Sequence, residues 1–451
     1  MSTPTTTQVL EQLERLAGEA PTRLGDPEQL WYQGRRRQRA RWAGTAAALV
    51  VLAVLGAVAV PRALQRTPDR VAANPDAELR LPDVIRQPEE WEPAFPSAPG
   101  PLVAAGLGTR GSWWSSRAAL WGVSATTGES RFLDLPDVAW AGGPALSTDG
   151  RRLAYWFTDE DVEAHPGTLE PGGTRPLPPA GVAVVDLDSG DIERWEAEAP
   201  HGVTSEGLAW ADDVLWWSAR TLPVGEDDIR SWRRTHTWDV GTDQRRVVEK
   251  GTAARDLFLS AVGPATGGFV VDDYLRLHVV QGDRVARTLK LDTEIGGRYG
   301  GPALSPDGAR VAAVLPYVRD RDGVGGEEAP VAVSRADGRM TDFTRVGDVS
   351  SAAVLGWRSE DEVVIETRTG TVNEPVHTVS VVDVRTADVT TLLEFDGNIP
   401  SFAADAWSAE VIEAPDAPRA PDPRVVGALV LMVGAFVVTL ANRLRRRRAG
   451  A

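Results

Sequence analysis

The alternation of apolar and polar positions between residues 101 and 396 is typical of short strands joined by tight turns. Residues 301–314 read GPALSPDGARVAAV, and residues 143–156 repeat the design as GPALSTDGRRLAYW. In the first copy Pro306 presets φ, Asp307 suits the next turn position, and Gly308 supplies the positive φ that closes a hairpin. Asp149 and Gly150 take the same places in the second copy. Two copies of one hairpin predict a repeat architecture.

A second kind of hairpin, with a short polar turn between alternating strands, follows each copy of the first kind. The first kind is expected at 102–114, 144–156, 207–217, 259–271, 302–314 and 354–365, and the second at 120–133, 184–195, 237–248, 278–289, 331–343 and 381–393. Paired hairpins of this kind build four-stranded antiparallel units. The sequence therefore predicts an all-β fold, a six-bladed β-propeller over 101–396, with seven blades as the alternative.

The motif at 304–308 (LSPDG) and 146–150 (LSTDG) resembles the strand–turn motif of TolB-type, WD40-like propeller repeats. The resemblance covers most of 100–396, although only these two copies carry the motif cleanly. Other copies have Asp212-Asp213, Gly267-Gly268 or Glu360-Asp361 at the turn. The family includes periplasmic protein-binding propellers and regulatory propellers fused to peptidases. The resemblance therefore implies a protein-interaction module more readily than an enzyme.

Two uncharged apolar runs, 43–60 and 425–441, lie near the ends of the chain. As a helix the first run is about 27 Å long and just spans a bilayer core, and the second run mirrors it at the far end. Arginines that would set the topology flank them on the outer side: Arg35, Arg36, Arg37, Arg39, Arg41, Arg443, Arg445, Arg446, Arg447 and Arg448. Such clusters favour the cytoplasmic side. The pattern predicts one transmembrane helix at each end, with cytoplasmic termini and an extracytoplasmic propeller. A cleaved signal peptide ending near Ala57-Val58-Ala59 is the alternative for the first run.

The remaining segments complete the expected domain organisation. Residues 1–42 form a cytoplasmic segment with apolar residues at helical spacing, either a simple amphipathic helix or a docking helix for a cytoplasmic partner. Repeated prolines predict an extended stalk over 61–100 and a return stalk over 397–424. Residues 442–451 form an arginine-rich cytoplasmic tail.

Charge and composition narrow the classes of partner. The net charge is −16, and because the two tails carry twelve arginines but only five acids, residues 62–424 are left at about −23. Such an acidic body repels a phosphate backbone, so no nucleic-acid partner is expected. The chain has no Cys, which excludes disulfides and thiolate metal sites. Abundant Ala, Gly and Pro, with arginine almost the only basic residue, resemble the composition of an actinobacterial protein.

No motif for catalysis, a metal or a cofactor is found. The five histidines have no metal-ligand spacing, and the chain has no GxSxG motif, no P-loop and no GxGxxG in a strand–helix context. Asp186, Asp188 and Asp191 surround Gly190 as in a calcium loop, but the twelfth position holds Ala197 and the segment fits a hairpin turn. Neighbouring tryptophans such as Trp216 and Trp217 fit packing between blades as well as sugar stacking, and packing is the preferred interpretation.

The connections between the two hairpins of a unit are longer and charged, at 157–180, 218–236, 315–330 and 366–376. In a propeller they emerge on one common face, where binding sites are usual. The expected partner-binding residues are Asp159, Glu160, Asp161, Arg230, Arg233, Arg234, Arg319, Asp320, Arg321 and Asp322.

Three functions fit this sequence. The first is a non-enzymatic, membrane-anchored scaffold that binds an envelope protein or a peptide. The second is a transmembrane signalling protein, similar in layout to membrane anti-sigma regulators, in which residues 1–41 dock a cytoplasmic regulator. The third is a carbohydrate-active propeller enzyme, which requires carboxylates to converge at the central channel.

Overall fold

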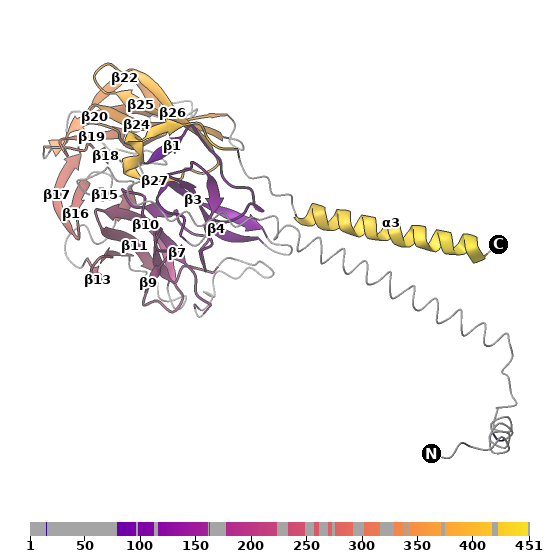
Figure 1. The fold of residues 1–451 in the computed structure, drawn as a ribbon. Helices are drawn as coiled ribbons and strands as arrows, with labels where there is room; N and C mark the ends of the chain where they lie inside the picture. The colour runs from indigo at the N-terminus through magenta and orange to yellow at the C-terminus, as the bar shows by residue number, and fades with distance from the viewer. Residues whose placement is uncertain are drawn as a thin grey trace, which may run out of the picture. The chain divides into compact units, whose positions relative to one another are not determined.

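The computed structural model of the chain forms two compact units, which are described separately. One unit spans Pro68–Ala420 and the other combines Met1–Thr67 with Pro421–Ala451. The larger unit is the all-β propeller in Figure 1. The residues that the structure describes are 79–95, 98–111, 116–160, 177–222, 233–248, 257–260, 269–272, 276–291, 302–315, 329–337, 339–340, 343–370, 375–416 and 423–449, together with Arg15 and Val162.

Five repeats form blades from strands that pair antiparallel in chain order. They consist of β6 (Ala145–Leu146), β7 (Arg152–Phe157), β8 (Gly181–Asp186) and β9 (Ile192–Glu196); β10 (Val203–Ala211), β11 (Val214–Thr221), β12 (Arg233–Asp239) and β13 (Gln244–Val247); β14 (Leu257–Ser260), β15 (Phe269–Asp272), β16 (Arg276–Gln281) and β17 (Arg284–Leu291); β18 (Ala303–Leu304), β19 (Arg310–Val314), β20 (Ala329–Arg335) and β22 (Thr344–Ser351); and β23 (Ala353–Trp357), β24 (Glu362–Gly370), β25 (Pro375–Asp383) and β26 (Val389–Asp396). The short β21 (Arg339–Met340) pairs in parallel with β17.

The ring is completed by a composite sheet in the order β27-β3-β4-β5. Its strands come from both ends of the propeller: β3 (Leu102–Gly111), β4 (Ser116–Ser124), β5 (Ser130–Phe132) and β27 (Ser401–Phe402). The sequence predicts a hairpin over 102–114, but β3 continues as one strand because 106–109 (GLGT) has no Asp-Gly turn and pairs with β4 along its whole length. The prediction of six equivalent blades, or of seven, is therefore wrong. Five repeats form blades, and the first predicted repeat supplies only three strands.

The segments expected as stalks contribute to the fold where the two ends of the propeller meet. Strand β1 (Arg80–Pro82) pairs in parallel with β28 (Glu410–Ile412), and β2 (Val84–Ile85) pairs in parallel with the outer strand β26. Leu81 and Ile85 are buried, as is Trp407 of the short helix η3 (Ala404–Ser408). We call this junction the seam.

Alternate residues of each strand pack against opposite neighbouring sheets, which is the expected use of a period of two. In β7, Leu153 and Tyr155 join the core shared with the composite sheet, whereas Trp156 joins the core shared with blade β10–β13. In β11, Trp217 faces blade β6–β9, while Trp216 packs with Val280 of the following blade. The adjacent tryptophans thus serve packing between blades.

The second apolar run lies in α3 (Pro423–Ala449), and its described side chains include the exposed Leu431 and Phe436. Among the residues that the structure describes, no helix is long and apolar enough to cross a membrane. The uncharged part of α3 covers 425–441, about 26 Å, against about 30 Å for a bilayer core. Residues 43–60 and Arg35–Arg41 lie outside the described residues.

The predicted transmembrane helix at each end is therefore wrong, and so is the location inferred from it. A cell-membrane protein with two spans, cytoplasmic termini and an extracytoplasmic propeller needs two spanning helices, and no described helix meets that requirement. The arginines expected to set this topology include Arg443 and Arg446, which are exposed on the last turns of α3.

Candidate functional site

The residues predicted to bind a partner are not brought together in the described part of the chain. Asp159 and Glu160 follow β7, and Arg234 is exposed on β12. Arg233 begins β12, and nothing is described of its side chain. The others lie outside the described residues: Asp161, Arg230, Arg319, Asp320, Arg321 and Asp322. The loop-face hypothesis therefore stays a prediction.

The repeat-turn residues Asp149 and Asp307 occupy equivalent places in two hairpins. A serine two residues earlier donates its hydroxyl to each carboxylate, at 2.6 Å from Ser147 and 2.5 Å from Ser305. Each carboxylate also accepts the backbone N–H two residues later, at 3.1 Å and 3.0 Å respectively. The hydroxyl of Ser305 is the main reason that the pKa of Asp307 is lowered. The turn thus holds an ionised carboxylate in a fixed conformation.

Two kinds of polar contact join these turns to the next blade. Arg152 contacts Asp213 of the following blade at 2.8 Å, and Arg310 contacts Asp361 at 2.9 Å. A buried tryptophan makes the second contact in the same two interfaces. Trp210 donates its Nε1–H to the Ala145 carbonyl of β6, and Trp357 donates to the Ala303 carbonyl of β18, both at 2.9 Å. Turn positions that depart from the LSPDG pattern therefore supply the acceptors for arginines of their neighbours.

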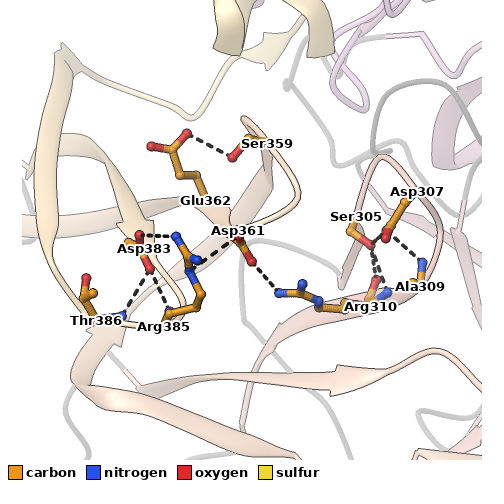
Figure 2. A network of polar contacts seen from close by, with 10 residues as sticks. All are labelled: Ser305, Asp307, Ala309, Arg310, Ser359, Asp361, Glu362, Asp383, Arg385 and Thr386. Atoms are coloured by element: carbon orange, nitrogen blue, oxygen red, sulfur yellow. Dashed lines mark hydrogen bonds and ion pairs between the residues drawn. The ribbon is translucent and has the colours of Figure 1, made fainter.

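Figure 2 shows how this contact continues into blade β23–β26. Asp361 lies between Arg310 and Arg385, and its second carboxylate oxygen is 3.5 Å from the Arg385 guanidinium. Asp383 accepts the backbone N–H groups of Arg385 and Thr386, which lower its pKa. Every charged group of this network has a partner within the protein, so the network serves to hold adjacent turns and blades together.

Two of the described histidines, His236 and His377, stack on aromatic rings. His236 stacks on Trp217 with ring centroids 3.8 Å apart, and its pKa is lowered to about 4, mainly by burial and then by the charge of Arg234. His377 pairs with the fully buried Glu366 and stacks on Phe395. His236 lies opposite Trp217 in the strand register, and His377 lies diagonally across from Glu366 on the neighbouring strand, so neither pair is visible as a sequence motif. Within the described residues, no group of three or more His, Asp or Glu side chains is arranged to hold a metal ion.

A cleft of about 450 Å³ lies at the seam, and we call it the seam cleft. Four separate segments converge on it: the chain around and after β2, the β4–β5 turn, the end of β26 and the chain after β28. The lining residues are Val84, Arg86, Gln87, Pro88, Glu89, Glu92, Gly128, Glu129, Ser130, Asp396, Gly397, Ala414, Pro415 and Asp416. The cleft is thus built from tertiary contacts between the first and last parts of the propeller.

Close backbone packing defines one wall of the seam cleft. Gly128 has φ 72°, and a Cβ there would lie 3.3 Å from Ile412 Cδ1 and from Pro415 Cδ. Gly397, which also lines the cleft, has φ 90°. A left-handed backbone favours glycine at both places. The side of the cleft that Gly128 forms is therefore closely packed against the segment after β28.

The seam cleft is strongly acidic. Five carboxylates line it against the single guanidinium of Arg86: Glu89, Glu92, Glu129, Asp396 and Asp416. Glu129 is paired at 2.9 Å with Arg131, which stands behind the wall. Glu92 is only 6% exposed, and its pKa is raised, chiefly by burial and also by the charge of Glu89, despite an opposing backbone hydrogen bond from Glu89 and the charge of Arg131. Ionising Glu92 in this cleft therefore costs free energy.

The seam cleft is not evident from the sequence alone. Proline-rich segments predict extended stalks, and β1 and β2 are too short to show an alternating pattern. The available signal is the sequence LPDVIRQPEEWEP at 81–93, in which Leu81, Ile85 and the neighbouring acids interrupt the proline run. Only the pairing of β1 with β28 shows where these acids lie.

Comparisons with known proteins add the following findings. No model of a protein family matches the chain, and no curated protein matches its sequence significantly. Among solved structures, TolB from Acinetobacter baumannii is 14% identical over 68% of this chain and 67% of that one, with a TM-score of 0.40. A putative TolB from Agrobacterium tumefaciens is 15% identical over 66% of this chain and 91% of that one, with a TM-score of 0.35. The dihydro-heme d1 dehydrogenase NirN is 15% identical over 70% of this chain and 59% of that one, with a TM-score of 0.33. All three TM-scores are below 0.5.

Proposed function

We propose that the chain is a non-catalytic binding module whose propeller holds a segment of another protein, or a peptide, in the seam cleft. The observation that carries this proposal is the seam cleft itself, an opening of about 450 Å³ into which four separate chain segments project carboxylates. Concave sites with a few convergent polar groups are the usual places for ligands.

The class of ligand follows from the repeat motif in the sequence. LSPDG at 304–308 and LSTDG at 146–150 resemble TolB-type repeats, a family that includes protein-binding propellers. The partner expected on that basis is an envelope protein or a peptide. In the described turns, Ser305 and Asp307 of the motif bind one another, and Arg310, which follows the motif, contacts Asp361 of the next blade. Partner binding is therefore assigned to the seam cleft and not to the motif.

Site-specific photo-crosslinking of the full chain tests this function. A benzophenone amino acid replaces the exposed Asp396 in the cleft, and in a matched variant it replaces the exposed Glu193 on β9. In cells of the organism that encodes the protein, the Asp396 position should give a discrete adduct with another polypeptide, identified by mass spectrometry, and the Glu193 position should not. Adducts of equal yield from both positions, or none from the cleft, would overturn the proposal.

A further inference from the structure

The seam cleft has an excess of negative charge, because among the described residues only Glu129 of its five carboxylates forms an ion pair, with Arg131 at 2.9 Å. Five carboxylates and the guanidinium of Arg86 line it, and with Arg131 set against Glu129 a net charge of about −3 remains when all are ionised. Arg131 forms no ion pair with any other carboxylate of the described residues. Like charges in a concave site raise the local concentration of a cationic ligand.

Glu92 provides a second and independent observation. Its side chain is more than nine-tenths buried, lines the cleft, and has no ion-pair partner at contact distance among the described residues. A buried carboxylate without a cation is costly. Its raised pKa, due first to burial, agrees with this cost. A ligand cation inside the cleft would remove much of it.

The remaining walls favour an organic cation over a metal ion. Val84, Pro88, Ala414 and Pro415 supply apolar surface beside the acids. Lysine and arginine side chains place an aliphatic stem on such surface while the charged end reaches a carboxylate. The described residues contain no group of three or more ligands arranged for a metal. The carboxylates and the apolar surface of the cleft together therefore match the charged end and the aliphatic stem of a lysine or arginine side chain.

We infer that the seam cleft selects a cationic segment of its partner, inserting a lysine or arginine between Glu92 and the exposed acids Asp396 and Asp416. This inference rests on the proposed function and adds the chemistry of the bound segment. Because the site joins β2, β26 and the chain after β28, bound peptide also contacts both ends of the propeller.

Fluorescence anisotropy with the purified full chain tests the inference. The probes are three twelve-residue peptides in which leucine alternates with arginine, with lysine or with glutamate. The arginine and lysine peptides should bind, the glutamate peptide should not, and binding should weaken as NaCl rises from 50 to 300 mM because the attraction is screened. Removing three cleft charges (Glu92→Gln, Asp396→Asn and Asp416→Asn) should raise the Kd at least tenfold.

A matched variant removes the same charge elsewhere. Glu193→Gln, Glu196→Gln and Glu198→Gln change three exposed acids on or just after β9 and should alter the Kd less than twofold. If the triple cleft variant does not fold, Asp396→Asn with Asp416→Asn alone should still raise the Kd severalfold. An equal loss in the cleft and matched variants would overturn the inference, since the attraction would then be non-specific.

Two further outcomes separate the inference from the proposed function. In the first, calcium or magnesium chloride displaces the arginine peptide at equimolar concentration, and the cleft variant abolishes this displacement. That result would show a metal site and overturn the inference that the cleft binds a lysine or arginine side chain. A photo-crosslinked partner that contacts Asp396 through an acidic or uncharged segment would also overturn the inference, while the proposed function would stand.

Discussion

At the scale of single residues, the repeat depends on a serine, an aspartate and a glycine within four positions. The Ser147 hydroxyl donates to Asp149 and accepts the backbone N–H of Arg152, so one side chain joins both strands of the hairpin. Gly150 then adopts φ 71° and accepts the N–H of Leu102 in the composite sheet at 2.9 Å. This glycine is needed both for its conformation and for close contact with another sheet.

Gly150→Ala should lower the free energy of unfolding by about 1–3 kcal/mol, because the left-handed backbone strains a residue with a Cβ. The added Cβ would also lie only 2.1 Å from the Leu102 carbonyl oxygen, so the interface must shift. Urea unfolding measures the effect. Gly143→Ala is the matched control, since its Cβ would meet nothing within 4 Å, and it should change stability by less than about 0.5 kcal/mol. Equal losses would show that the contact with Leu102 is unimportant.

His236 should make the fold sensitive to acid. Its pKa is about 4 in the folded chain and about 6.5 when exposed, so between these values the unfolded chain binds more protons. Stability due to this group is therefore fully present above about pH 6.5 and is lost as the pH falls towards 4. On the order of 1–2 kcal/mol should be lost between pH 7 and pH 5. In His236→Phe, which retains an aromatic ring against Trp217, urea unfolding should show a smaller loss over this interval.

At the scale of elements, the blades are held together by contacts that repeat from one interface to another. Trp210 and Trp357 each donate to a carbonyl of the preceding blade's inner strand, and Arg152 and Arg310 each contact an aspartate in the next turn. The two arginine contacts are partly exposed and should each contribute less than about 1 kcal/mol. The buried tryptophan bonds should matter more, because a buried carbonyl loses its partner when they are removed.

Trp357→Phe and Trp217→Phe separate this hydrogen bond from the loss of volume. Both tryptophans are essentially fully buried, but only Trp357 donates a described hydrogen bond, to Ala303 O at 2.9 Å. Trp217 Nε1 is buried and has no hydrogen-bond partner among the described residues. Trp357→Phe should therefore cost about 1 kcal/mol more than Trp217→Phe in urea unfolding. The reverse order would show that ring packing, and not the bond to Ala303, dominates.

At the scale of the whole propeller, the first and last strands depend on one another. The composite sheet takes β27 from the end of the propeller, β28 pairs with β1, and β2 extends the last blade. Buried residues of the seam, including Leu81 and Trp407, belong to the largest apolar core. Closure of the ring at the seam therefore pairs the edge strands of two sheets and buries apolar surface at the same time.

A chain that ends at Asp396 should not unfold cooperatively near the full-length melting temperature, because it lacks β27, η3 and β28. Circular dichroism during heating measures this. A chain that ends at Asp416 retains all three elements and should melt like the full propeller. If the shorter chain melted at the same temperature, the closure of the ring at the seam would contribute little to stability.

Several features follow from local sequence alone. The alternation of apolar residues identifies most strands of the five continuous blades, and Asp-Gly turns mark two of their hairpins, because strand period and turn chemistry act within a few residues. The hairpin predicted over 331–343 is wrong in its second strand, since the outer strand of that blade is β22 (Thr344–Ser351) and β21 pairs with β17. The opposite packing of Trp216 and Trp217 follows from the same period. The roles of Asp213 and Asp361 as acceptors do not follow from local sequence, since the arginine that contacts each of them lies on another blade.

The composite sheet and the seam cleft depend on tertiary structure. The stretch 102–111 becomes one strand because β4 and β27 both pair with it, and β27 lies about three hundred residues away in sequence. Glu92, Glu129, Asp396 and Asp416 share one cleft only because β1 and β28 close the ring. Local propensity acts between residues that are neighbours in the chain. A site formed where the first and last strands of the propeller meet depends instead on which strand edges stay unpaired until the ring closes.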